Sequence, residues 1–112
     1  MDKKALRKQY EEMRHPMGCF MLTCSISGEH YIGVTKDLDT IKQRNFFRLS
    51  VGALANLPSL QAAYANHGED AFTFKILEFL PPMEETEAIE ENLAILLELY
   101  KEQVPQAKEI RV

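Results

Sequence analysis

Apolar residues recur along the chain with two different periods, and these periods predict its helices and strands. Leu6, Tyr10 and Met13 follow a helical period, so a helix is expected over residues 2–14, before Pro16. Other stretches are short and rich in strand-forming residues instead. They cover residues 17–24, 30–34 and 71–80.

The first two of these strands are joined by a Ser/Gly-rich link, which is typical of an antiparallel hairpin. One helix is expected to begin near Leu38 and to stop at Gly52, and the next to run from Pro58 to Gly68. The longest helix is expected over residues 83–103. The order α-β-β-α-α-β-α predicts an α+β fold in which helices flank a three-stranded antiparallel sheet.

The longest predicted helix carries more apolar residues than one core-facing stripe requires. Its core stripe consists of Ile89, Leu93, Leu96, Leu97 and Tyr100. Ile95 and Leu99 extend the apolar surface beyond that stripe. This surplus indicates a contact either with a partner or with the helix expected over residues 2–14. A homodimer through this longest helix is one form that a partner contact can take.

Length and composition are those of a single globular domain of 112 residues, with 46% apolar and 27% charged residues. We divide it into an N-terminal helical extension (1–16), a core (17–103) and an irregular, loosely held tail (104–112). No apolar run approaches the roughly 18 residues of a membrane span, and the N-terminus has no apolar signal core. A cytoplasmic protein without a membrane segment is therefore expected. Cys19 and Cys24 fall on opposite faces of one strand, so no disulfide is expected between them.

Charge is distributed unevenly. Residues 1–50 carry nine Lys/Arg against six Asp/Glu, whereas residues 51–112 carry four against eleven, and the net charge is −4. An acidic chain is a poor candidate for unspecific nucleic-acid binding, which depends on neutralising phosphates. A local basic face on the first half is still compatible with DNA as a partner.

Several short motifs fall at places that match a known family. The triplet Gly18-Cys19-Phe20 lies in the first hairpin strand and Tyr31-Ile32-Gly33 in the second, and "TKDL" follows the second triplet. Farther on come "NHGEDAFTFKILEFLP" and "EENLAILLE". With these motifs the chain resembles the GIY-YIG nuclease family over residues 17–103. It is most similar to a bacterial branch that also occurs joined to transcription regulators.

This resemblance implies hydrolysis of DNA phosphodiesters with one divalent metal, Mg²⁺ or Mn²⁺. Glu91 matches the family's metal-binding glutamate, and Glu90 competes with it because the alignment crosses a one-residue gap. A solvated acidic helix face accounts for both equally well. Tyr31 matches the tyrosine that serves as general base or orients the water, which requires a pKa lowered from about 10. Gly33, on the same strand face, leaves room for a backbone to approach.

The chain also departs from the family pattern. Phe20 replaces a tyrosine, and the family's arginine would fall at Ile41, so Arg44, one turn farther along the helix, is the substitute that we consider. Asn45 stands where histidine is common. Other candidates are phosphate contacts at Lys42 and Arg48, and site-lining positions at Gly18 and His67.

Ordinary structural roles compete with these assignments. Lys42 and Arg48 also suit a solvated helix surface, and His67 suits a helix end, where the dipole favours it. The catalytic set is thus incomplete. Three functions stay open at this point: a DNA endonuclease, a domain that binds DNA without cleaving it, and a protein-interaction module.

Overall fold

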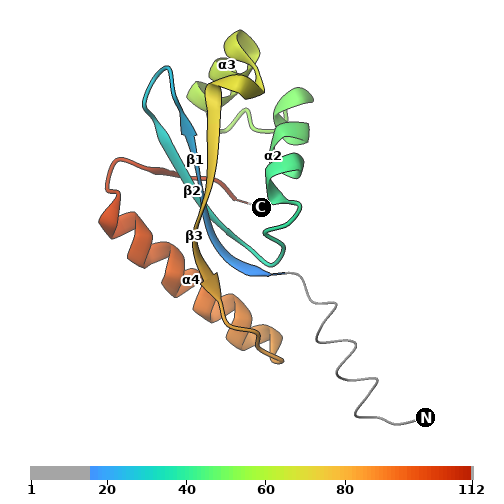
Figure 1. Ribbon diagram of the computed structural model, residues 1–112, viewed down its shortest axis with the longest axis vertical. Coiled ribbons are helices and arrows are strands. Elements are labelled where there is room, and N and C mark those ends of the chain that lie inside the picture. The colour runs from blue at the N-terminus through green and yellow to red at the C-terminus, as the bar shows by residue number, and fades with distance from the viewer. Residues whose placement is uncertain (1–15, 112) are drawn as a thin grey trace, which may run out of the picture.

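A four-stranded sheet forms the centre of the computed structural model, which describes residues 16–111 (Figure 1). Its strands are β1 (Met17–Cys24), β2 (His30–Thr35), β3 (Phe72–Leu80) and β4 (Lys108–Glu109), in the spatial order β3-β1-β2-β4. β1 is antiparallel to both β2 and β3, which confirms the predicted hairpin. The helix expected over residues 2–14 lies outside the described residues.

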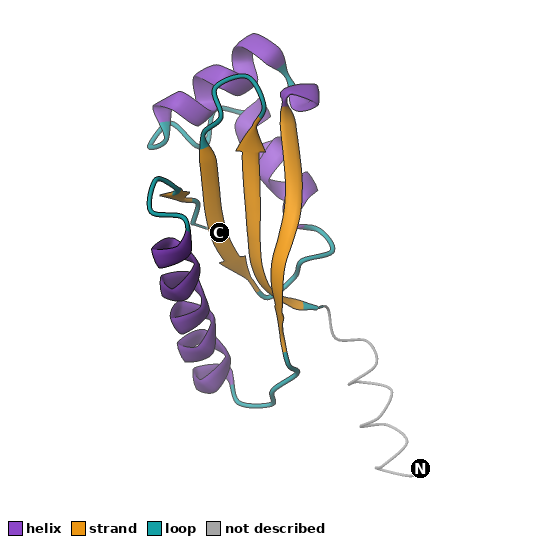
Figure 2. Ribbon diagram, turned by 60° about the vertical axis from the view of Figure 1, so that its left-hand side comes forward, coloured by secondary structure: helices purple, strands orange, loops and turns teal. Residues whose placement is uncertain are grey.

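Helices cover both faces of this sheet. They are α2 (Ile41–Ser50), α3 (Pro58–His67) and α4 (Thr86–Gln103), with a short 3₁₀ turn at Glu69–Ala71 before β3. Figures 1 and 2 show α2 and α3 on one side of the sheet and α4 on the other. The helix expected to begin near Leu38 is α2, and it begins at Ile41. Leu38 lies in the preceding loop, where its backbone N–H donates a hydrogen bond to the carbonyl of Pro16.

Two apolar clusters fill the space between these layers. The larger joins the sheet to α2 and α3, and the smaller joins it to α4. Phe20, Tyr31 and Ile41 belong to the larger cluster, whereas Cys19 and Ile32 belong to the smaller. Neighbouring residues of one strand thus enter different cores, as strand alternation requires. Cys19 and Cys24 are both buried free thiols.

The prediction of a three-stranded, wholly antiparallel sheet with a loose tail is wrong at the C-terminal end. β4 adds a fourth strand, parallel to β2, within the stretch expected to be irregular. Ile110 follows it, is 1% exposed, and donates its backbone N–H to the carbonyl of Ile32 at 2.8 Å. A two-residue strand has no periodicity to recognise, and one buried isoleucine holds it in place.

Within residues 16–111, no helix combines the length and the apolar character that crossing a membrane requires.

Candidate functional site

Arg44 and Glu90 line the same pocket, although they come from helices on opposite faces of the sheet. The pocket has a volume of about 360 Å³ and lies where β2 ends. Its walls consist of Val34, Thr35, Lys36, Asp37, Arg44, Glu90 and Leu93. We call it the Arg44–Glu90 pocket. Arg44 is exposed near the start of α2, and the structure gives its guanidinium no ion-pair partner within residues 16–111.

Glu90 reaches the pocket by way of an ion pair with Lys36. The Lys36 Nζ lies 3.2 Å from Glu90 Oε1, and both side chains are at least half exposed. Such an exposed pair contributes little to stability, typically about 0.2–1 kcal/mol. Lys36 is therefore easily exchanged for another cationic partner of the carboxylate.

Glu91, one residue farther along α4, faces elsewhere. It lines a shallow groove on the outer side of α4 together with Ile95, Leu99 and neighbouring glutamates. Successive helix positions are separated by roughly 100°, which explains why adjacent glutamates enter different surfaces. Of the two candidates for the metal ligand, the structure thus brings Glu90 to Arg44 and leaves Glu91 outside that pocket.

Tyr31 is buried and its hydroxyl already has a partner. The side chain is 1% exposed, and the hydroxyl donates a hydrogen bond of 2.5 Å to Glu29 Oε2. Burial raises the pKa of Tyr31 above its ordinary value, and the hydrogen bond and charge of Glu29 raise it further. The family role as a base requires a shift in the opposite direction.

The Arg44–Glu90 pocket also lies at the other end of β2 from this hydrogen bond. Tyr31 is bonded toward Glu29, which precedes the strand, whereas the pocket is lined by residues from Val34 onward. The four residue steps from Tyr31 to Thr35 span about 13 Å. Tyr31 is not among the residues that line the pocket.

Phe20 and Gly33 face each other across the hairpin and pack tightly. Phe20 is 0% exposed and stacks on Phe74 with ring centroids 5.8 Å apart. A Cβ on Gly33 would lie 2.6 Å from Phe20 Cζ and 2.6 Å from the carbonyl oxygen of Ile110. A backbone does approach at Gly33, as expected, but it belongs to the chain's own C-terminal segment.

Gly18 has a comparable packing role on the other edge of β1. A Cβ there would lie 2.0 Å from the carbonyl oxygen of Glu78 in the neighbouring strand β3. No L side chain fits at that distance from a backbone atom. The requirement for glycine at this position therefore follows from strand packing.

Arg48 binds the C-terminal segment, and Asn45 binds Arg48. Asn45 is 2% exposed, and its Oδ1 accepts a hydrogen bond of 3.3 Å from Arg48 Nη1. The same nitrogen donates to the backbone carbonyl of Arg111 at 2.7 Å. Ile41, at the family's arginine position, is 0% exposed. These positions therefore lie in or against the core.

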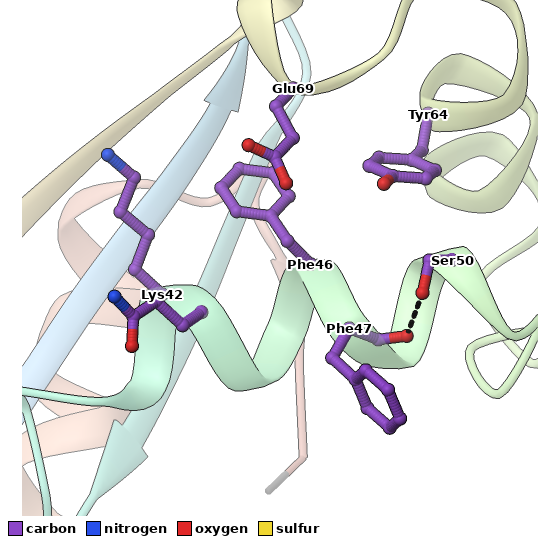
Figure 3. Close-up of a pocket in the computed structure, with 7 residues that line it drawn as sticks. Lys42, Phe46, Phe47, Ser50, Tyr64 and Glu69 are labelled. Carbon is purple, nitrogen blue, oxygen red and sulfur yellow. Dashed lines mark hydrogen bonds between the residues drawn. The ribbon is translucent and has the colours of Figure 1, made fainter.

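Lys42 lines a different pocket, between α2 and α3 (Figure 3). Its volume is about 500 Å³, and Phe46, Tyr64 and Glu69 also contribute to its walls. The figure shows Tyr64 and Glu69 on the side opposite α2, while the ring of Phe47 points away from them. His67 is exposed at the end of α3 and lines neither pocket.

Sequence reasoning missed Lys36 and Asp37 as pocket residues. Both belong to the "TKDL" motif that follows the second triplet, and this position could have marked them. The carboxylate of Asp37 orders the turn before α2, because Oδ1 accepts from the backbone N–H of Asp39 and Oδ2 from the Thr40 hydroxyl.

Carboxylates in the Arg44–Glu90 pocket suit a hard divalent cation. Within residues 16–111 no three His, Cys, Asp or Glu side chains are grouped to hold a metal ion. Mg²⁺, however, usually keeps several waters and takes only one or two carboxylates. Glu90 and Asp37 both line the pocket and offer oxygen donors of this kind. The donor set therefore fits Mg²⁺ or Mn²⁺.

Comparison with solved structures identifies the fold. The chain is similar to the catalytic domain of the homing endonuclease I-TevI, at 23% identity and a TM-score of 0.56, over 84% of this chain and 97% of that one. A mutant of the catalytic domain of intron endonuclease I-TevI matches at 22% identity and a TM-score of 0.58, over 83% of this chain and 91% of that one.

No family model and no curated protein sequence matches the chain. The structural likeness shows a nuclease-like fold, and it supports the resemblance to the GIY-YIG nuclease family at the level of the fold.

Proposed function

We propose that this chain is a metal-dependent DNA endonuclease domain that works at the Arg44–Glu90 pocket. The observation that carries the proposal is the meeting of these two side chains, from α2 and α4, in one pocket of a nuclease-like fold. The pocket supplies both charges that phosphodiester hydrolysis needs: a guanidinium for the phosphate and carboxylates for a cation.

Arg44 is the residue that would bind the scissile phosphate. Its planar guanidinium can donate two parallel hydrogen bonds to phosphate oxygens, which a lysine cannot match. Lys36 would assist as a point charge once Glu90 no longer holds it. The side chain of Arg44 is exposed and needs no change of the core to reach a ligand.

Glu90, together with Asp37, would hold Mg²⁺ or Mn²⁺ in the pocket. The bound cation supplies Lewis-acid stabilisation of the phosphate oxygens and acidifies a coordinated water. Glu90 would exchange its ion pair with Lys36 for the cation, which frees the ammonium for the phosphate. Tyr31 takes no part as a base, since its hydroxyl donates to Glu29 and its pKa is raised.

A second candidate is a domain that binds DNA phosphates without hydrolysing them. The specific observation in its favour is the state of the two family tyrosine positions. Phe20 has no hydroxyl, and the hydroxyl of Tyr31 is engaged with Glu29. Binding would still use Arg44 and Lys36, and it would weaken with salt in proportion to the phosphates neutralised.

Nicking of supercoiled plasmid in Mg²⁺ or Mn²⁺ tests the first candidate, with adjacent glutamates as a matched pair. Glu90→Gln should abolish nicking, whereas Glu91→Gln, which removes the same charge from the same helix, should leave it within about twofold of wild type. Arg44→Ala should reduce nicking at least a hundredfold, and Lys42→Ala is its control on the same helix.

Activity that survives Glu90→Gln would refute the assignment of the pocket. If no variant nicks, but salt-sensitive binding of a DNA oligonucleotide is lost in Arg44→Ala and kept in Lys42→Ala, the second candidate is correct. If neither the wild-type protein nor any variant, Ile110→Ala included, nicks or binds DNA, both candidates are rejected and a protein-interaction role is left.

If the chain has a protein-interaction role, we propose that it forms a homodimer through α4. Ile95 and Leu99 are 54% and 50% exposed on the outer face of α4. This face is bordered by Glu91, Glu98 and Glu102, so a dimer would bring the negative charges of the two copies close together. Such a dimer should strengthen with salt, in contrast to DNA binding, which should weaken.

A further inference from the structure

Residues 108–111, which we call the C-terminal strap, lie along the outer edge of β2. The strap pairs in parallel with β2, with Tyr31 opposite Lys108 and Ile32 opposite Glu109. This segment forms the edge of the sheet beyond β2 and leads to the end marked C in Figure 1. Its one deeply buried side chain is Ile110, at 1% exposure, within the cluster that also contains Tyr31.

The strap covers positions that the family resemblance marks for chemistry. The carbonyl oxygen of Ile110 lies 2.6 Å from where a Cβ on Gly33 would be, so this carbonyl can lie there only because residue 33 has no side chain. The carbonyl of Arg111 accepts the hydrogen bond from Arg48, which also holds Asn45. The strap thus contacts Gly33 and Arg48 directly, and it is linked to Asn45 through Arg48.

The strap gives the Arg48 guanidinium only a weak hydrogen-bond acceptor, the backbone carbonyl of Arg111. A backbone carbonyl is neutral, whereas a phosphate is charged and can accept two parallel bonds from a guanidinium. Arg48 lies one helical turn after Arg44, so both point along the same face of α2. A nucleic-acid backbone bound at Arg44 would therefore reach Arg48 next and compete with the strap for it.

The attachment of the strap is small enough to be reversible. Two residues form the ladder with β2, and one backbone hydrogen bond, from Ile110 to Ile32, continues it. The side chain of Arg111 is 85% exposed and bonds only its neighbour Glu109 among residues 16–111. Val34 lines both the Arg44–Glu90 pocket and a smaller pocket bordered by the strap, so one residue of β2 adjoins both.

We propose that the C-terminal strap is an internal competitor of nucleic-acid phosphate, and that it must leave Arg48 before DNA binds along α2. This inference rests on the DNA binding contained in the proposed function, but not on hydrolysis. Because only the fraction of molecules with an open strap binds fully, closure weakens the apparent affinity by that fraction.

Hydrogen exchange of the Ile110 amide reports the strap directly in the unaltered protein. The amide should exchange at least tenfold faster with a saturating single-stranded or duplex DNA oligonucleotide, without metal, while amides between β1 and β3 keep their rates. Oligonucleotide binding is followed separately by fluorescence anisotropy. Binding with unchanged or slower exchange at Ile110 would overturn the proposal.

Loosening the strap gives an independent measurement. Ile110→Ala should bind the oligonucleotide at least fivefold more tightly than wild type. Leu60→Ala is the matched control, because Leu60 is 0% exposed in the same cluster but belongs to α3. Equal tightening by both variants would mean general loosening and would reject the strap.

These measurements separate the two proposals. Binding with faster exchange, but no nicking in Mg²⁺, supports the strap and rejects hydrolysis. Binding only by Ile110→Ala also supports the strap. If neither wild type nor Ile110→Ala binds, Arg48 has no phosphate competitor and the strap proposal is wrong together with DNA binding.

Discussion

Replacing Gly33 by alanine tests how the hairpin and the C-terminal strap fit together. The new Cβ would lie 2.6 Å from both Phe20 Cζ and the carbonyl oxygen of Ile110. Carbon atoms prefer separations of about 3.5–4.0 Å, so the new Cβ would be about 1 Å too close to the ring. It would also be too close to the carbonyl oxygen, so relief requires β2 to shift away from the ring and displace the strap. The backbone of Gly33 does not have a positive φ, so the cost is steric.

Phe20 cannot retreat easily, because its ring is fully buried and stacked on Phe74. The strap is therefore expected to lift. Overpacking costs about 1–3 kcal/mol, and the lost bond from Ile110 to Ile32 costs about 1 kcal/mol. We expect Gly33→Ala to lower the free energy of unfolding by about 2–4 kcal/mol.

Urea unfolding measures this loss, and exchange of the Ile110 amide locates it. Gly28→Ala is the control, because no atom lies within 4 Å of its Cβ and only its φ of +76° adds strain, at about 1 kcal/mol. Neutral surface changes usually alter the free energy of unfolding by no more than roughly 0.5 kcal/mol. A change of that size or less in Gly33→Ala would refute the close fit of strap and hairpin.

Three further predictions concern other parts of the molecule. The raised pKa of Tyr31 means that stability is complete below pH 10, the ordinary pKa of tyrosine, and falls above it, since the unfolded chain loses the proton first. Urea unfolding at pH 9 and 11 should show a smaller loss in Tyr31→Phe. Burial raises the pKa of Cys19 to about 12, which leaves a thiolate fraction of about 10⁻⁴ at pH 8. Its labelling by a thiol reagent should be at least a hundredfold slower in the native than in the urea-unfolded protein, and equal rates would contradict its burial. Replacing Ile95 and Leu99 by aspartate should abolish any dimer in sedimentation equilibrium, and an unchanged dimer would place the contact elsewhere.

Much of the fold could be predicted because the signals were local. The hairpin follows from two strand-forming stretches and a Ser/Gly link, and α3 follows from Pro58 at its start and Gly68 at its end. β4 could not be predicted, because its position depends on one contact between distant segments. Ile110 is an isolated apolar residue near the end of the sequence, and it joins the core only because its backbone pairs with Ile32 and its side chain packs in the cluster of Tyr31.

The candidate site was less predictable, because it depends on which way side chains face. Residue type and approximate spacing made Arg44 a candidate and left Glu90 and Glu91 undecided. The choice between them is a rotation of about 100° on α4, which a one-residue uncertainty in alignment is enough to hide. The partners of Tyr31 and Arg48 were equally inaccessible, since Glu29 and the carbonyl of Arg111 carry no motif.

The altered family positions make sense together once their burial is known. Phe20, Ile41 and Asn45 are each at most 2% exposed, and the first two are fully buried. An arginine at position 41 would place an uncompensated charge in the core, which would lower the free energy of unfolding by about 3–5 kcal/mol. An apolar residue there and a phenylalanine in the first triplet are what a closed core requires. Chemistry or phosphate binding in this chain must therefore come from side chains at the rim of that core, and Arg44, one turn from Ile41, is placed there.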